Sequence, residues 1–206
     1  MKARDFFSGC SQCGLNRRQF LAGCAKCAGA AGLLGGADWL GAAEAAEKVR
    51  IRVIYALHDV VQPGPDWPNV GYDFGPVMER INKELAKGCP GFEFLSSMAA
   101  GAEQAQKIVE EDKAGTIDGY LVYQMNCWNP VVQTMVTTGK PVLYADYQYA
   151  GSGGFLVYTA GLMRGPTPNF AFVASSNRKD LVNAVRCFEL VKKGGTVSDF
   201  AAAVRQ

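Results

Sequence analysis

The chain has 206 residues, a formal net charge of +2 and a single histidine. The first 45 residues carry the whole charge excess, because basic and acidic side chains balance in the remainder. A neutral domain lacks the clustered positive face of nucleic-acid binding proteins, and one histidine excludes a multi-histidine metal site. After residue 45, no apolar run reaches the roughly 20 residues that cross a bilayer. What remains is the length of one domain with its own core.

Residues 1–45 have the order of segments typical of a twin-arginine signal peptide. Asn16–Leu21 resembles the motif itself, with two arginines, one spacer and then Phe-Leu. A weakly apolar stretch follows, up to about Leu40. Ala43-Glu44-Ala45 supplies small residues at both positions that a signal peptidase requires, so cleavage is expected before Ala46. The sequence therefore predicts export through the twin-arginine translocase, to the periplasm or the cell exterior.

Two other motifs overlap this leader and remain alternatives. Cys10-x-x-Cys13 and Cys24-x-x-Cys27 have the spacing of paired thiolates around Zn²⁺. The second pair, however, lies inside the apolar segment, and the twin arginines separate the two pairs. Leu21-Ala22-Gly23-Cys24 fits a lipoprotein signature by its letters, but it precedes the apolar segment that it should follow. The signal peptide is therefore the favoured interpretation.

The residues after the leader alternate between strand and helix patterns. Strands are expected at Val49–Leu57, Phe92–Leu95, Gly119–Tyr123, Pro141–Ala145 and Phe170–Ala174. Helices are expected at Pro76–Lys87, at Ala102–Ala114, from Asn129-Pro130 onward and at Arg178–Lys193. Such alternation predicts an α/β domain over residues 46–195: a three-layer, flavodoxin-like or Rossmann-like parallel sheet of about five strands, with helices on both faces.

The last residues predict a further element. Thr196–Phe200 begins another helical pattern, and the sequence reaches Gln206 without a glycine or proline that would close it. Residues 196–206 are therefore expected to start a further helix or domain, as part of a longer protein.

Candidate binding residues follow from the predicted topology. Ligands of open parallel sheets bind beyond the carboxyl ends of the strands, next to the point where the strand order reverses. The predicted site is a crevice formed by Asp59, Trp67, Gln124, Asn126, Trp128, Asp146 and Ser152. Aromatic, amide, hydroxyl and carboxylate groups suit a neutral carbohydrate, with Trp128 as a stacking face and Asp146 as a charged acceptor of hydroxyl groups. The loops hold no cluster of lysine or arginine for a phosphate.

Each of these residues also has a structural interpretation. His58 is more typical of a loop residue than of a catalyst, Asp146 could cap the next segment, and Trp128 could pack at a helix start. Gly151-Ser152-Gly153-Gly154 lacks the lysine of a phosphate-binding loop, so a tight turn or close backbone packing is favoured over an anion cradle. No nucleophile lies near a base in the sequence, and neither catalytic residues nor metal ligands are assigned.

Three segments carry a resemblance to a known family. They are Gly119-Tyr120-Leu121-Val122-Tyr123, Gly139-Lys140-Pro141-Val142-Leu143-Tyr144-Ala145-Asp146 and Tyr149-Ala150-Gly151-Ser152-Gly153-Gly154-Phe155-Leu156. Together they resemble the amino-terminal and middle region of L-fucose/L-arabinose isomerase-type proteins, over most of residues 49–195.

The resemblance implies an aldose–ketose isomerase that uses a divalent metal, commonly Mn²⁺. The family's metal ligands lie in later portions of its chains, so it implies no cofactor and no metal ligand for the residues here. Its first domains bind sugar edges and pack against neighbouring subunits, which implies a homo-oligomer for the full-length protein. The alternative is one lobe of a periplasmic sugar- or solute-binding protein without catalysis, and whether the protein is an enzyme stays open.

Overall fold

A computed structural model describes residues 47–205, so the predicted signal peptide and its cysteine motifs lie outside the described residues. Five parallel strands form one sheet in the order β2-β1-β3-β4-β5. The strands are β1 (Val49–Ala56), β2 (Phe92–Ala99), β3 (Gly119–Gln124), β4 (Val142–Asp146) and β5 (Phe170–Val173). This order is the flavodoxin-like order, so the predicted fold class is confirmed.

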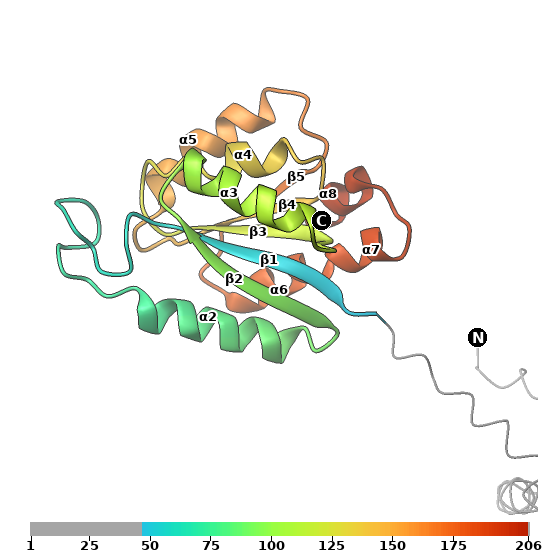
Figure 1. Cartoon of the computed structure of the whole chain (residues 1–206), viewed down its shortest axis with the longest axis horizontal. Helices are drawn as coiled ribbons and strands as arrows, with labels where there is room; N and C mark the ends of the chain where they lie inside the picture. The colour runs from blue at the N-terminus through green and yellow to red at the C-terminus, as the bar shows by residue number, and fades with distance from the viewer. Residues whose placement is uncertain (1–46, 206) are drawn as a thin grey trace, which may run out of the picture. The chain divides into compact units, whose positions relative to one another are not determined.

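Helices cover both faces of the sheet (Figure 1). They are α2 (Gly75–Gly88), α3 (Ala102–Lys113), α4 (Val132–Val136), α5 (Ser152–Met163), α6 (Arg178–Arg186), α7 (Phe188–Lys192) and α8 (Val197–Val204). Residues of α2, α6, α7 and α8 pack against one face, and residues of α3, α4 and α5 pack against the other. The layers are therefore helix, sheet and helix.

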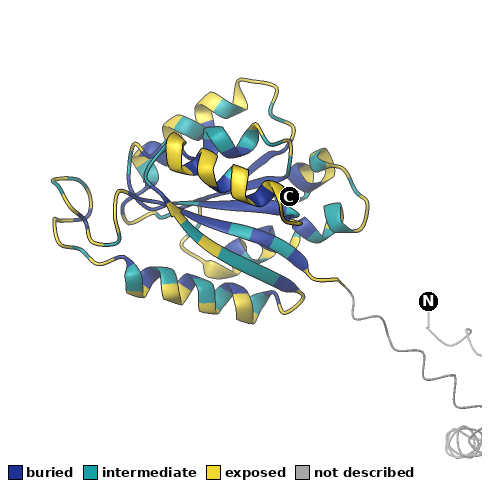
Figure 2. Ribbon diagram, in the orientation of Figure 1, coloured by how far each residue is buried: buried dark blue, intermediate teal, exposed yellow. Residues whose placement is uncertain are grey.

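The central strands are apolar because both of their faces are covered (Figure 2). In β1, Ile51, Val53 and Tyr55 pack toward α2 and α6, whereas Ile54 and Ala56 pack toward α3 and α5. At their carboxyl ends, Gln124 lies opposite both Ala56 and Asp146. The register thus brings the ends of β1, β3 and β4 together at one edge of the sheet.

The predicted helix at Arg178–Lys193 is in fact two helices, α6 and α7, with a break at Cys187. The Cys187 N–H donates to Ala184 O, and the Leu190 N–H donates to Cys187 O, so the chain tightens at this point. The break directs Phe188 into the core, where its side chain has no exposure. The apolar residues keep their helical spacing across this turn, so the sequence pattern predicted one continuous helix.

Helix α5 was not predicted. Its twelve residues include no charged side chain and are apolar on all sides, so they show no helical periodicity. Its exposed side includes Leu156, Val157 and Met163. Just before it, a Cβ on Gly151 would lie 1.9 Å from the backbone oxygen of Gln124, which explains why glycine stands there. Of the two interpretations favoured for this glycine-rich segment, a tight turn or close backbone packing, the structure has close packing at Gly151.

The other bounds differ by a few residues. β2 continues to Ala99, four residues beyond its predicted end, and α4 begins only at Val132. After Thr196, α8 packs into the same core, where the Phe200 ring stacks on Phe188 with centroids 4.6 Å apart. None of the helices among residues 47–205 is long and apolar enough to cross a membrane.

Candidate functional site

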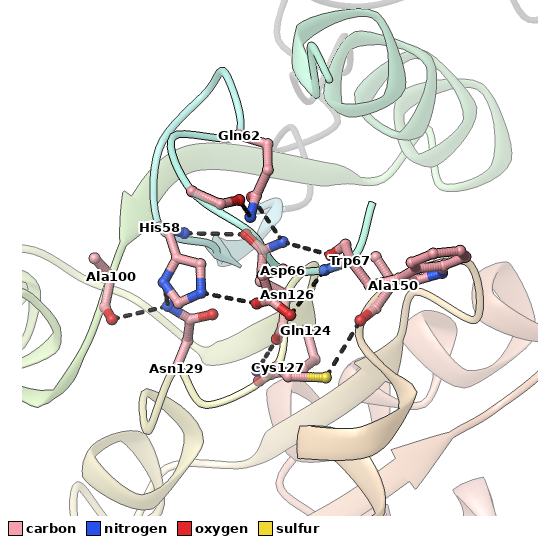
Figure 3. Close-up of polar contacts among 11 residues, drawn as sticks. His58, Gln62, Asp66, Trp67, Ala100, Gln124, Asn126, Cys127, Asn129 and Ala150 are labelled. Atoms are coloured by element: carbon pink, nitrogen blue, oxygen red, sulfur yellow. Dashed lines mark hydrogen bonds and ion pairs between the residues drawn. The ribbon is translucent and has the colours of Figure 1, made fainter. Parts of the chain in front are cut away.

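The topological switch point lies between β1 and β3, and the segment of residues 57–74 folds across it. Asn126, just after β3, binds this segment at three places (Figure 3). Its Oδ1 accepts from the His58 N–H at 3.1 Å, and its Nδ2 donates to Gln62 Oε1 at 3.2 Å and to Trp67 O at 3.0 Å. The side chain of Asn126 has no exposed surface. Its hydrogen-bonding groups therefore hold the segment in place.

The side-chain amide of Gln124 is also hydrogen-bonded to protein groups. Its Nε2 donates to Asn126 O at 2.5 Å, and its Oε1 accepts from the Tyr144 hydroxyl at 2.7 Å. Like Asn126, it is fully buried. The two amides that the sequence assigns to sugar hydroxyls thus already have protein partners, and neither faces solvent in this structure.

His58 joins the same network through both ring nitrogens. Its Nε2 lies 3.0 Å from Asp66 Oδ2, and its Nδ1 lies 3.2 Å from Asn129 Nδ2, which also donates to Ala100 O at 2.9 Å. Because an amide nitrogen only donates, Nδ1 is the acceptor and Nε2 carries the proton given to Asp66. With neither nitrogen free for a substrate, His58 fits the interpretation as a loop residue.

Three further predicted residues lie at the exposed rim of this region. The side chains of Trp67 and Trp128 are 61% and 62% exposed, and the Trp67–Pro68 peptide bond is cis. Trp128 has a φ of 62°, in the left-handed region that few residues other than glycine adopt. Asp59 accepts from the Val60 N–H at 2.6 Å within its own loop. The three residues belong to the loops around the switch-point network, and none of them lines the neighbouring cavity at this edge of the sheet.

A separate cavity of about 160 Å³ lies at the same edge of the sheet, on the side of α2 and α6. Its polar lining residues are Arg80, Glu84, Tyr123, Asp146, Tyr147, Gln148, Tyr149, Ser175, Ser176 and Arg178. They come from α2, from the ends of β3 and β4, from the segment after β5 and from α6. A volume of this size holds about five water molecules, which is the scale of one small ligand.

Asp146, the last residue of β4, is the predicted site residue that lines this cavity. Its side chain is only 7% exposed, and its Oδ2 accepts from the Ser152 hydroxyl at 2.9 Å. Burial raises the pKa of the carboxyl group, and the hydrogen bond from Ser152 counteracts this in part. Ser152 thus orients Asp146 from behind and does not itself line the cavity.

Aromatic and cationic side chains form the walls of this cavity, and the aromatic ones are tyrosines. The Tyr147 hydroxyl lies 3.2 Å from that of Tyr72, and the Tyr149 side chain is 56% exposed. Burial raises the pKa of Tyr123 to about 12, so this residue is a neutral phenol at physiological pH. The arrangement offers aromatic faces, hydroxyl groups and a desolvated carboxylate within one small space.

Two arginines face the same cavity, which the sequence analysis missed. Arg178 forms an ion pair with Glu84, whereas Arg80 forms none with any described residue. Arg178 directly follows the loop after β5, so extending the search for site residues by one residue beyond this loop would have found it. Arg80 is in the second turn of α2, and only the packing of α2 against the sheet brings it here. The loops alone lack a basic cluster, but the folded cavity contains two cations.

Among residues 47–205, no group of three or more histidine, cysteine, aspartate or glutamate side chains is placed to hold a metal ion.

No family model matches the chain, and no curated protein matches it. Among solved structures, it is similar to a regulatory protein of the LacI family from Chloroflexus aggregans, with 10% sequence identity and a TM-score of 0.33. The alignment covers 76% of this chain and 72% of that one. A likeness at this level says nothing about ligand or activity, and the strand order itself defines the fold.

Proposed function

We propose that this chain binds a carbohydrate in the cavity at the carboxyl ends of β3, β4 and β5, as a domain of an exported protein. The observation that carries the proposal is Asp146, a buried carboxylate that lines an open cavity and has the Ser152 hydroxyl as its one hydrogen-bond donor among the described residues. A carboxylate accepts strong hydrogen bonds from sugar hydroxyls. Exposed Tyr149 offers a face for the sugar ring, and Ser176 lines the same cavity with a further hydroxyl group.

Carbohydrate binding in this cavity is compatible with two classes of protein. A lobe of a periplasmic sugar- or solute-binding protein would use the cavity as half of its ligand site. An L-fucose/L-arabinose isomerase-type protein would use it to hold a sugar while metal-dependent catalysis takes place in other portions of that protein. Added Mn²⁺ discriminates the two in a full-length protein: aldose–ketose conversion supports the isomerase, and binding without conversion supports the lobe.

Calorimetric titration of the mature domain with monosaccharides at millimolar concentration tests the proposal. Asp146→Asn keeps the shape but removes the charged acceptor, so we expect affinity to fall about tenfold or more, the range for hydrogen bonds to charged groups. Asp59→Asn is the matched control, because Asp59 is a carboxylate of the switch-point loop outside the cavity. No heat from any sugar, or equal losses in both variants, would contradict the proposal.

The export part of the proposal has its own test. Replacing Arg17 and Arg18 by lysine should block export, because lysine lacks the planar guanidinium fork. Mass spectrometry of the exported protein should find an amino terminus near Ala46. Normal export of the double-lysine precursor would refute the twin-arginine interpretation, and a lipidated Cys24 would establish the lipoprotein alternative.

A further inference from the structure

The two arginines that line the cavity differ in whether a carboxylate is paired with them. Arg178, the first residue of α6, is neutralised by its ion pair with Glu84 of α2. Arg80, one helical turn before Glu84, has no carboxylate partner among residues 47–205. The Arg80 charge nevertheless acts on the cavity, because it counters the rise in the pKa of Tyr123 and Tyr147. One cation of the site is thus available to a ligand.

The cavity therefore presents two unlike groups. Asp146 at the end of β4 is an acceptor for hydroxyl groups, and Arg80 on α2 is a donor with the fork geometry that fits a carboxylate with two parallel hydrogen bonds. A neutral sugar uses only the first group. A ligand with hydroxyls at one end and a carboxylate at the other uses both, and its negative charge is directed away from Asp146 by the repulsion between the two carboxylates.

We infer that the ligand is an acidic monosaccharide, a uronate or an aldonate, whose hydroxyls bind Asp146 and whose carboxylate binds Arg80. The inference rests on the proposed carbohydrate-binding function and names the class of sugar. Exposed Tyr149 lines the same cavity and offers a ring-stacking face. The cavity volume of about 160 Å³ suits one monosaccharide.

Calorimetry with matched pairs of sugars tests the inference. The probes are D-glucuronate against D-glucose and D-galacturonate against D-galactose, with D-glucose 6-phosphate and sodium acetate as separate arms. We expect at least one uronate to bind about tenfold or more tightly than its neutral partner. In Arg80→Gln this preference should fall to about twofold or less.

Lys83→Gln is the matched control, because it removes the same charge from the same helix at a residue that does not line the cavity. It should keep the preference for the uronate. Equal binding of neutral and acidic sugars would overturn the inference and leave the carbohydrate-binding proposal intact, whereas no binding of any sugar would overturn both.

Three other outcomes also overturn the inference. They are a preference for the uronate that survives Arg80→Gln, binding of the sugar phosphate tighter than that of every uronate, and binding of acetate as tight as that of the uronate. The first would place the carboxylate elsewhere, the second would make the site specific for phosphate, and the third would make it a simple anion site.

Discussion

Two polar regions lie at the carboxyl edge of this sheet, and they differ in how far the hydrogen-bonding groups of their side chains are paired with other protein groups. At the switch point, the amides of Gln124 and Asn126 are fully buried and bonded to the protein. In the cavity, Asp146 is almost as buried but has one hydroxyl partner, and Arg80 has no ion pair among the described residues. Satisfied polar groups stabilise a fold, whereas polar groups facing a cavity with unused capacity are available to a ligand.

The difference predicts which substitutions change stability and which change binding.

Asn126→Ala should lower the free energy of unfolding by about 3 kcal/mol, because it removes three hydrogen bonds of about 1 kcal/mol each and leaves the buried Gln62 side chain without one of its partners. For a domain of this size, the melting temperature falls by about 6–12 °C. Chemical and thermal unfolding measure both quantities. Asn183→Ala on the exposed side of α6 is the control and should stay within about 0.5 kcal/mol of wild type. A stable Asn126→Ala domain would mean that the network does not anchor the segment of residues 57–74.

Gly151→Ala should cost about 2–3 kcal/mol, the upper range for overpacking, because its Cβ would overlap the Gln124 carbonyl. Gly151 follows β4 on the chain, and here its segment packs against Gln124 at the end of β3. In the same region of the chain, Gly161→Ala meets no atom within 4 Å and should raise stability by about 0.5–1 kcal/mol. Similar effects of the two alanines in denaturant titrations would show that the close approach at Gly151 carries no energy.

Trp128→Asn removes the exposed aromatic ring that the sequence assigned to stacking, and asparagine tolerates the left-handed backbone of this position. Since Trp128 does not line the cavity, sugar affinity should change about twofold or less and stability by about 0.5 kcal/mol or less. A tenfold loss of affinity by calorimetry would move the ligand from the cavity to the switch-point crevice.

The smallest effect is one of pH. Because folding raises the pKa of Asp146, its stabilising contribution is complete below the ordinary aspartate pKa and is lost as the pH rises through the raised value. The melting temperature of Asp146→Asn relative to wild type should therefore increase from pH 3.5 to pH 7. Asp199, the exposed capping carboxylate of α8, has a lowered pKa, so Asp199→Asn should show the opposite trend. Parallel trends in thermal melts of the two variants would contradict this assignment.

The sequence predicted the parallel sheet and the helical layers on both of its faces, because parallel strands with covered faces are apolar runs separated by amphipathic helices. It did not predict α5, whose residues are apolar on every side, nor the break at Cys187, which keeps the helical period through the turn. Periodicity reports a boundary between core and solvent. It therefore gives no signal for a helix without such a boundary, as in α5, and it does not reveal a break where two consecutive helices share one boundary, as in α6 and α7.

For the site, the sequence by itself determined which edge of the sheet carries the polar loops, and it identified Asp146 among them. Only the tertiary structure decided that Gln124 and Asn126 are occupied by the segment of residues 57–74, because those bonds join residues about 60 positions apart. It also decided that Arg80 of α2 faces the end of β4. Local sequence encodes the elements, but which polar groups are satisfied and which face a cavity depends on contacts between elements, since hydrogen-bond partners are chosen by packing in space.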